Sequence, residues 1–529
     1  MHFFLRFRGT LETAPAIWAA QQLLEGTPSA AQMELAHALL RHALALEPWD
    51  RELATLANSL AAAMGRPPLP LPDAPPRAAI DTIVERHRDD LLALLRTDLP
   101  APARHRILLS LWAAGQHPEV VATEAHTWAR ATPSSPNFGI LAWAAHGLGA
   151  TELRDLLLER AAPTCFWAEN LRAAIAMLHG DAEAARRHLV ASLRLEPAQP
   201  HAVEQLALLG EGLPALPQAD ATVHILFYTF NKLETTLRTL ESVLATDIGD
   251  AAITLLNNGS TAFSPADLEA GVARVAQGRP VRCIHLPVNI GAPAARNWLW
   301  HLPEVQQARY VAFLDDDVLL PRHWLSRFLA DLEAHPQYCA VGGKVVNPNA
   351  FHTIQYVYRY FQEVGEQHIR FTPNAPMFFD LGQYDVVRPC LSVMGCCHLF
   401  HRRRMERLGV PDFDVRFSPS QVDDLERDIQ IWKHGGMVLY DGRVRIMHLQ
   451  DAGSAAPKSE AAWAHVWGNH QKMEAKFRGQ ELRAIHARVQ ETEAKAWRTT
   501  LARTREFLPE SARTFWTTQM KNASTSKQP

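Results

Sequence analysis

Residues 221 to about 452 alternate short, β-rich apolar runs with amphipathic segments of helical length. Strands that are joined through helices run parallel and need cover on both faces of their sheet. The pattern therefore predicts an α/β domain built around a mostly parallel sheet. The expected strands are 223–229, 252–256, 281–286 and 310–314, and the expected helices between them are 231–246, 264–277 and 292–303.

Polar or glycine-rich residues follow each expected strand. In open α/β sheets, ligands bind beyond the carboxyl ends of the strands, so we expect a site along this edge. The four strand ends read Thr229-Phe230-Asn231-Lys232, Asn257-Asn258-Gly259-Ser260, Asn289-Ile290-Gly291 and Asp315-Asp316-Asp317.

The three consecutive aspartates, Asp315, Asp316 and Asp317, are the sharpest chemical feature of this edge. Adjacent carboxylates repel one another unless a cation neutralises them, and hard carboxylate oxygens favour Mg²⁺ or Mn²⁺. Three acids alone are explained equally well by a solvated acidic turn or by the N-cap of a helix that starts near Pro321.

Residues 1–215 are rich in alanine and leucine and carry apolar residues at helical spacing, which predicts an all-α region. The segments 41–60 and 187–210 both run from an amphipathic helix through Leu-Glu-Pro into a second helix. This unit resembles the tetratricopeptide type of helical repeat. Such a region either binds a protein partner or an acceptor, or only supports the next domain. The proline-rich stretch 65–79 is expected to be an exposed linker.

Residues 453–529 are expected to form C-terminal helices after a Gly/Ser/Ala/Pro connector, with a disordered tail over the last nine residues. The opening of the chain lacks the apolar core of a signal peptide, and no apolar run is long enough to span a membrane. The six cysteines form no metal-ligand spacing, which favours free thiols in a reducing, cytoplasmic compartment.

The charge balance is nearly neutral, with 53 basic against 56 acidic residues and a formal net charge of −3. This balance removes any global electrostatic case for nucleic acid or an anionic membrane as the main partner.

Seven segments in one order resemble family 2 of the inverting glycosyltransferases, which have the GT-A fold, over residues 221 to about 477. The segments read HILFYTFNKLETTLRTLESVL, LLNNGS, VNIGAPAARNWLW, FLDDDVLLP, MGCCHLFHRRRMERLGVPDFD, QVDDLERDIQIWKHGG and VRIMHL. The resemblance implies a multidomain protein, with helical repeats before a Rossmann-like GT-A domain at 221–452.

The resemblance also implies roles for individual residues. Asp317 would bind a divalent metal, Mn²⁺ or Mg²⁺, with Asp315 beside it and His448 completing the site. Asp315 or Asp316 would contact the ribose of the donor or the metal shell. The residues expected to line the donor pocket are Thr229, Phe230, Asn231, Asn257, Asn289 and Arg296.

An inverting transfer needs a carboxylate that takes the proton of the acceptor hydroxyl. The resemblance places it in the pair Asp423-Asp424, with Gly435 at the expected distance, and Asp424 is the predicted base. Ser420 and Asp423 also have the spacing of a capping box, so both acids can be explained by the helix N-terminus alone.

Two residues depart from the family pattern. Asn257 stands where the family usually has an aspartate that pairs with the nucleotide base, and Asp423 stands where it usually has a glutamate. A UDP-sugar remains the favoured donor.

We therefore expect an inverting, metal-dependent glycosyltransferase that moves a sugar from a nucleotide-diphosphate donor to a hydroxyl of a glycan or protein, as in polysaccharide or glycoprotein biosynthesis. The main alternative is a non-catalytic scaffold with a decayed transferase domain. A nucleotidyltransferase is disfavoured because no glycine-rich activating loop with Arg and Lys follows the first strand.

Overall fold

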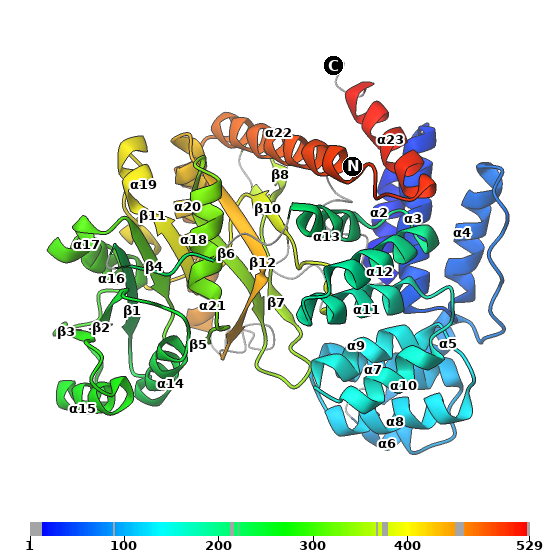
Figure 1. The fold of residues 1–529 in the computed structure, drawn as a ribbon, viewed down its shortest axis with the longest axis horizontal. Coiled ribbons are helices and arrows are strands. Elements are labelled where there is room, and N and C mark those ends of the chain that lie inside the picture. Colours follow the sequence, from blue (N-terminus) through cyan, green and yellow to red (C-terminus); the bar gives the residue numbers. More distant parts are fainter. Residues whose placement is uncertain are drawn as a thin grey trace.

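The structure is a computed structural model, and it describes residues 13–87, 90–211, 216–220, 222–366, 369–372, 379–449 and 460–525. Residues 1–12, in which we expect no signal peptide, and the connector at 450–459 lie outside these ranges. The molecule has an all-helical side and a sheet-containing side, with one long C-terminal helix lying across both (Figure 1).

The main sheet carries the strand order β10-β12-β6-β11-β4-β1-β2-β3. Strands β1 to β4 pair in parallel, whereas β11 runs antiparallel to both of its neighbours. The short strands β5 and β7 extend the sheet by pairing with β12 and β6, and β8 and β9 form a separate hairpin. The bounds are β1 (Val223–Thr229), β2 (Ala252–Asn257), β3 (Arg282–His285), β4 (Tyr310–Leu314), β5 (Val318–Leu319), β6 (Tyr338–Val346), β7 (Ile354–Tyr356), β8 (Phe361–Val364), β9 (Ile369–Phe371), β10 (Val387–Cys390), β11 (Cys397–His401) and β12 (Met437–His448).

The predicted strands and helices of this region are found in the structure. The bounds of β1 and β4 match the expected strands 223–229 and 310–314, because each is a buried, largely apolar run that polar residues end abruptly. The connecting and covering helices are α14 (Leu233–Leu244), α15 (Pro265–Ala276), α16 (Ala292–Trp300), α17 (Pro303–Gln307), α18 (Trp324–Ala334), α19 (Arg402–Leu408) and α20 (Asp423–Lys433), with a 3-10 turn at Val415–Phe417.

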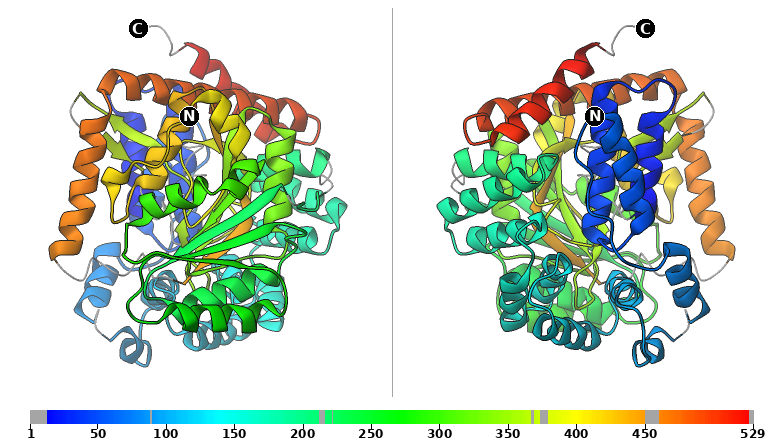
Figure 2. Two further views of the ribbon diagram at one scale, coloured as in Figure 1. Left: turned by 90° about the vertical axis from the view of Figure 1, so that its left-hand side faces the viewer. Right: turned by 90° about the vertical axis from the view of Figure 1, so that its right-hand side faces the viewer.

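Each face of the sheet has its own apolar core. Alternate residues of one strand point to opposite faces, so Leu226 of β1 packs with Trp300 and Trp432, while Phe227 packs with Trp324 on the other side. Figure 2 shows helices on both sides of the strands. Burial on both faces is the reason why these strands are largely apolar, and the buried His224 of β1 and Thr254 of β2 are hydrogen-bonded to each other.

The N-terminal region is helical, as predicted. Helices α3 and α4, and likewise α12 and α13, are the pairs expected around the two Leu-Glu-Pro turns, whereas the tetratricopeptide type of the repeat stays a prediction. The described part of the proline-rich stretch has no helix or strand over 66–76. The bounds are α2 (Thr13–Leu24), α3 (Ala30–Leu46), α4 (Arg51–Ala63), α5 (Arg77–Arg86), α6 (Leu91–Leu95), α7 (Ala101–Ala113), α8 (Pro118–Ala131), α9 (Asn137–Gly147), α10 (Thr151–Arg160), α11 (Phe166–Leu178), α12 (Ala182–Leu195) and α13 (Pro200–Glu211).

The C-terminal helices join the two sides. Helices α21 (Glu460–Lys476), α22 (Gly479–Thr504) and α23 (Glu510–Thr525) follow the sheet, and α23 lies against α3 and α12 (Figures 1 and 2). Trp497 and Trp516 are buried in one core with α2, α3 and α13. The expected disorder of the last nine residues is wrong for 521–525, which belong to α23, and the remaining four lie outside the described residues.

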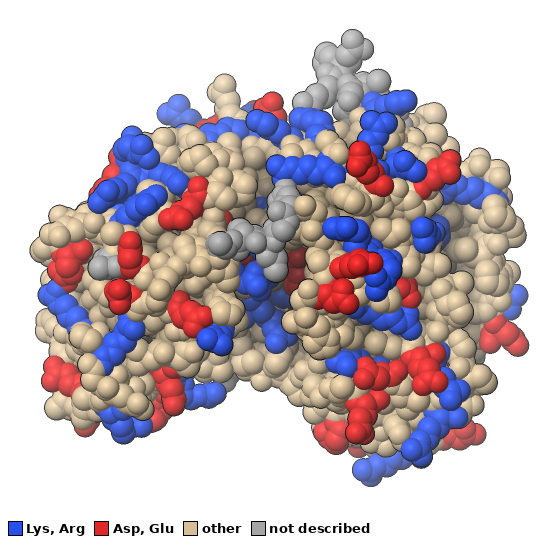
Figure 3. Space-filling view, in the orientation of Figure 1, with Lys and Arg blue, Asp and Glu red and all other residues tan. Residues whose placement is uncertain are grey.

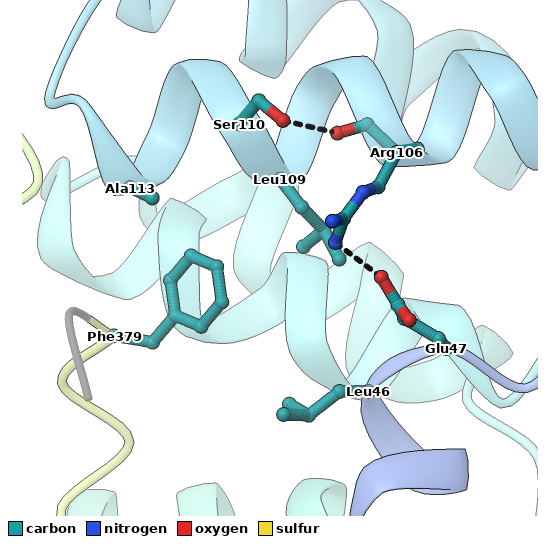
Figure 4. Close-up of a pocket in the computed structure, with 7 residues that line it drawn as sticks. All are labelled: Leu46, Glu47, Arg106, Leu109, Ser110, Ala113 and Phe379. Carbon is teal, nitrogen blue, oxygen red and sulfur yellow. Dashed lines mark hydrogen bonds and ion pairs between the residues drawn. The ribbon is translucent and has the colours of Figure 1, made fainter. Parts of the chain in front are cut away.

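The helical side packs directly on two loops of the α/β side. Phe351 and Phe379 are buried in the same core as Trp112 of α7, and the rings of Trp112 and Phe379 lie 4.6 Å apart. A small cavity of about 140 Å³ remains beside Phe379, closed on one side by the ion pair between Arg106 and Glu47 (Figure 4). Residues 1–215 and 221–452 therefore share apolar cores within the described part of the chain.

A larger groove of about 1360 Å³ lies between α13, α18, α22 and the beginnings of β6, β10 and β12. Its lining includes Arg388 and Arg443, which pair with Glu493 and Asp331. In Figure 3 the hollow between the two sides has Lys and Arg at its floor. Arg388 and Arg443 are thus paired with acids of α22 and α18, at the edge of the sheet opposite the strand ends predicted to hold the site.

Among the described helices, none is both long enough and apolar enough to cross a membrane.

Candidate functional site

The predicted site residues gather at the carboxyl ends of the parallel strands. Asp315, Asp316 and Asp317 follow β4, and Thr229 ends the neighbouring β1. The last residues of β12 cross to the same place because β12 pairs antiparallel with β5, which puts His448 opposite Val318. The N–H of Leu449 donates to the carbonyl of Asp317 at 2.7 Å, which fixes this junction.

Asp315, Asp317 and His448 form the group that suits a metal ion. One ligand atom from each lies within 4.8 Å of the others. His448 Nε2 lies 2.9 Å from Asp317 Oδ1, and the Lys232 ammonium lies 2.8 Å from Asp317 Oδ2. Burial opposes ionisation, but His448 and Lys232 lower the pKa of Asp317 to about 2. A carboxylate that stays ionised beside an imidazole is a suitable donor set for Mn²⁺, Mg²⁺ or a similar divalent cation.

Asp316 points to a different environment from its two neighbours. Its carboxylate lies 3.4 Å from Lys232 Nζ, and burial raises the pKa of Asp316 to about 6 despite this cation. Asp316 is not among the residues whose ligand atoms converge. Lys232, which the sequence analysis did not assign, bridges Asp316 and Asp317, and its position directly after β1 was the signal for it.

Arg296 is buried between two acids and two rings. Its guanidinium donates to Asp423 and, at 3.2 Å, to Asp315 Oδ1, and it lies over the rings of Tyr228 and Phe413. Arg296 therefore links the start of α20 to the group formed by Asp315, Asp317 and His448, which we call the metal-type cluster. The expected contact of Arg296 with a nucleotide stays a prediction.

Asp423 and Asp424 open α20 but differ in their environments. Asp423 is buried against Arg296, and burial raises its pKa to about 6 although the guanidinium opposes the shift. Asp424 is partly exposed, and its Oδ2 accepts the N–H of Gly395 at 2.9 Å. The N-cap position is Val422 in a left-handed conformation without a side-chain cap, so the capping-box interpretation of Ser420 and Asp423 is wrong.

The backbone at Gly395 lies between Asp424 and the acids that follow β4. A Cβ at this position would lie 2.8 Å from Cβ of Asp424 and 3.3 Å from Nη2 of Arg296. The next carbonyl, that of Cys396, accepts the N–H of Asp315 at 2.9 Å. The backbone at 395–396 thus ties the start of α20 to the acids after β4.

The asparagines predicted to bind a donor hold the loops of this edge together. Asn231 Oδ1 accepts the N–H groups of Thr261 and Ala262 at 2.7 and 2.9 Å. Asn257 Oδ1 accepts the N–H of Ser260 at 2.9 Å, and Asn289 Oδ1 accepts from Asn258 Nδ2 at 3.0 Å. Hydrogen bonds therefore connect the loop after β1 to the loop after β2, and the loop after β2 to the loop after β3.

The two residues at the end of β1 differ in accessibility. Thr229 is buried and its hydroxyl is bonded to Thr236 at 2.7 Å. Phe230 is 40% exposed, and its expected contact with a donor stays a prediction.

Comparison with known proteins finds a similarity for this region. Residues 225–409 match the family model described as Glycosyl transferase family 2. No curated protein sequence matches the chain. Among solved structures, GalNAc-T7, crystallised with UDP, GalNAc and Mn²⁺, is 15% identical with a TM-score of 0.35.

That comparison covers 51% of this chain and 55% of GalNAc-T7, so the chain matches little more than half of that protein. The mannosyltransferase PcManGT from Pyrobaculum calidifontis, in complex with GDP-Man and Mn²⁺, is 17% identical with a TM-score of 0.35, covering 66% of this chain and 92% of the other. Residues 225–409, which make up most of the α/β side of the chain, are thus similar to glycosyl transferase family 2.

Proposed function

We propose that the protein is an inverting, metal-dependent glycosyltransferase that transfers a sugar from a nucleotide-diphosphate donor, a UDP-sugar as first choice, to a hydroxyl of a glycan or protein. The observation that carries this proposal is the convergence of Asp315, Asp317 and His448 at one strand edge, with Asp424 tied to the same edge through Gly395.

Asp317 and His448, with Asp315, would hold the divalent metal. When bound, such a metal neutralises the negative charge that develops on a leaving nucleoside diphosphate. Lys232 is the cation that balances Asp317 in the structure, and its side chain is 43% exposed. Its flexible stem would allow the ammonium to pair with a phosphate of the donor in place of Asp317.

The donor would lie over the connected loops after β1, β2 and β3. Phe230 offers an exposed ring, and Asn231, Asn257 and Asn289 keep the loop backbones in place. Thr229 and Asp316 form the floor next to Lys232. Arg296 would act by holding Asp315 and Asp423 in place.

Asp424 is the better candidate for the base that takes the proton of the acceptor hydroxyl. Asp423 is buried and engaged by Arg296, so its carboxylate is not free to meet an acceptor. Asp424 is partly exposed, and the N–H of Gly395 fixes one of its oxygens. A base on the opposite side of the sugar from the leaving group gives inversion.

The remaining parts of the proposal concern organisation and compartment. We assign residues 1–215 to a helical acceptor- or partner-binding region, 221–452 to the transferase and 453–529 to the C-terminal helices. All six cysteines are free thiols, which favours a reducing, cytoplasmic setting.

The test is a thermal-shift panel of the full chain with UDP, GDP, CDP and dTDP, each with and without Mn²⁺. Ligand binding to the native state raises the melting temperature, so one nucleotide should give a metal-dependent increase. Asp317→Asn should abolish that increase. Glu234→Gln, an exposed acid at the start of α14, is the matched control and should preserve it.

The scaffold alternative predicts the opposite result. If no nucleotide shifts the melting temperature of the folded protein with Mn²⁺, the transferase proposal is refuted.

A further inference from the structure

The loop between β6 and β7 connects the helical side of the molecule with His448. In Figure 1 this loop reaches from the sheet to the helices of the N-terminal region. It is closed on itself, because the N–H of Asn347 donates to the carbonyl of Thr353 at 2.8 Å. Phe351 at its tip is buried in the core of the helical side.

Two glycines of the helical side contact this loop, and we call these contacts the seat of the loop. Gly115, in the turn between α7 and α8, lies so close to Asn349 that a Cβ would be 2.3 Å from Asn349 Nδ2. Gly147, at the end of α9, would place a Cβ 3.1 Å from the carbonyl oxygen of Phe351. Any larger residue at Gly115 must therefore displace the side chain of Asn349.

A chain of side-chain hydrogen bonds leads from Asn349 into the sheet. Asn349 Nδ2 and Asn347 Nδ2 both donate to Thr353 Oγ1, at 2.7 and 2.9 Å. Asn347 Oδ1 then accepts from Gln355 Nε2 at 3.0 Å. Because the amide nitrogen of Gln355 is used in this way, its oxygen Oε1 faces His448 Nδ1 at 2.7 Å.

Gln355 reaches His448 because it is the extra residue of a β-bulge. Val345 of β6 pairs with Tyr356 and Val346 pairs with Ile354, so the strand register shifts by one residue at Gln355. A bulge re-aims the side chain of its extra residue. Gln355 is 7% exposed, and its amide is thus held on the metal-type cluster from inside the protein.

The order of donors and acceptors decides which nitrogen of His448 faces the aspartates. An amide oxygen can only accept, so Nδ1 of His448 must carry the hydrogen. Nε2 is then the nitrogen that faces Asp317 Oδ1, at 2.9 Å, and it is the one that would be available to a divalent metal. Hydrogen bonds of this kind orient metal-binding histidines and raise their basicity.

We propose that Gln355 is the positioning residue for His448 and that the seat of the β6–β7 loop on Gly115 couples the helical side of the molecule to divalent-metal affinity. This inference rests on the proposed function, because it requires that His448 binds the metal through Nε2. It gives the N-terminal helices a role in the transferase site that needs no contact with substrate.

The probe is Mn²⁺ alone, titrated into the full chain and followed by the electron paramagnetic resonance signal of free Mn²⁺. Gln355→Leu removes the acceptor and should weaken Mn²⁺ binding about 10- to 100-fold, as for other outer partners of metal ligands. Gln355→Glu keeps an acceptor for Nδ1 and should restore affinity to within a few-fold of the wild type. An unchanged affinity in Gln355→Leu overturns the positioning role.

The coupling is tested by a matched pair of glycines. Gly115 and Gly149 have nearly the same left-handed backbone, with φ of 67° and 71°, but nothing lies within 4 Å of a Cβ at Gly149. Both alanine variants carry the same backbone strain. Gly115→Ala alone should weaken Mn²⁺ binding, about tenfold.

Equal affinities in the two glycine variants overturn the coupling. If Gly115→Ala is unfolded by its melting curve, Asn349→Ala, which removes the side chain that contacts Gly115 and donates to Thr353, replaces it, and wild-type affinity in that variant overturns the coupling. Wild-type protein that binds no Mn²⁺ refutes the proposed function and this inference together. If the wild type binds Mn²⁺ and the variants bind it with the same affinity, only the inference is refuted.

Discussion

The contact between Gly395 and Asp424 makes a sharp prediction for catalysis. Gly395→Ala would place a Cβ 2.8 Å from Cβ of Asp424, 3.1 Å from its Oδ2 and 3.3 Å from Arg296 Nη2. Non-bonded carbon atoms pack at about 3.5–4.0 Å, so the start of α20 must retreat by about 0.7–1.2 Å. A misplacement of about 1 Å in catalytic geometry costs on the order of 10²-fold in rate.

The expected result is therefore a fall in turnover of about 10²-fold with little change in nucleotide binding. Turnover is measured as nucleoside diphosphate released from the donor with water as acceptor, and nucleotide binding by the Mn²⁺-dependent thermal shift. Gly468→Ala, in α21, is the control because nothing lies within 4 Å of its Cβ. Normal turnover in folded Gly395→Ala would refute the argument that Asp424 must lie against this backbone.

Three further predictions follow from the same structure. Asp424→Asn should lower turnover by about 10² to 10⁴-fold with nucleotide binding retained, and equal turnover in the variant would remove Asp424 as the base. Lys232→Met removes the cation beside Asp317 and should tighten the binding of Mn²⁺ alone severalfold; weaker binding would mean that Lys232 is no competitor of the metal. Burial lowers the pKa of His105 from 6.5 to about 4, so the unfolded chain binds a proton that the native state does not, and stability should fall as the pH drops through this window by on the order of 3 kcal/mol. Urea unfolding at pH 7 and pH 5 should show a smaller loss for His105→Gln than for the wild type, and equal losses would contradict the assignment.

The sequence predicted the strand edge well because that edge follows local rules. β1 and β4 are apolar runs ended by polar residues, and parallel strands bring such ends together. The resemblance to a known family placed His448 at the same edge, although it lies more than a hundred residues away in the sequence. Local pattern and motif order together were enough to predict that the acids after β4 and His448 lie at the same edge of the sheet.

Other parts of the site depend on pairing that no local pattern shows. Gln355 has its position only because β7 pairs with β6 one residue out of step, and a polar residue in a strand gives no sign of this. Arg296 is expected to contact a nucleotide, and the sequence gives no sign that it is buried between Asp315 and Asp423, because this depends on the packing of α16 against β1, β2 and the 3-10 turn. Helical periodicity likewise predicted buried faces in residues 1–215 without saying that Trp497 and Trp516 would cover them.

The packing of α23 against the first helices has a consequence for biosynthesis. Gln519 Nε2 donates to the carbonyl of Ala31 at 3.2 Å, across 488 positions of sequence. Helices α2 and α3 are made before α23, so part of their apolar surface is uncovered until α23 has left the ribosome. A ribosome-stalled chain that lacks α22 and α23 should be cleaved by protease within α2 and α3, and a chain that includes both helices should resist that cleavage.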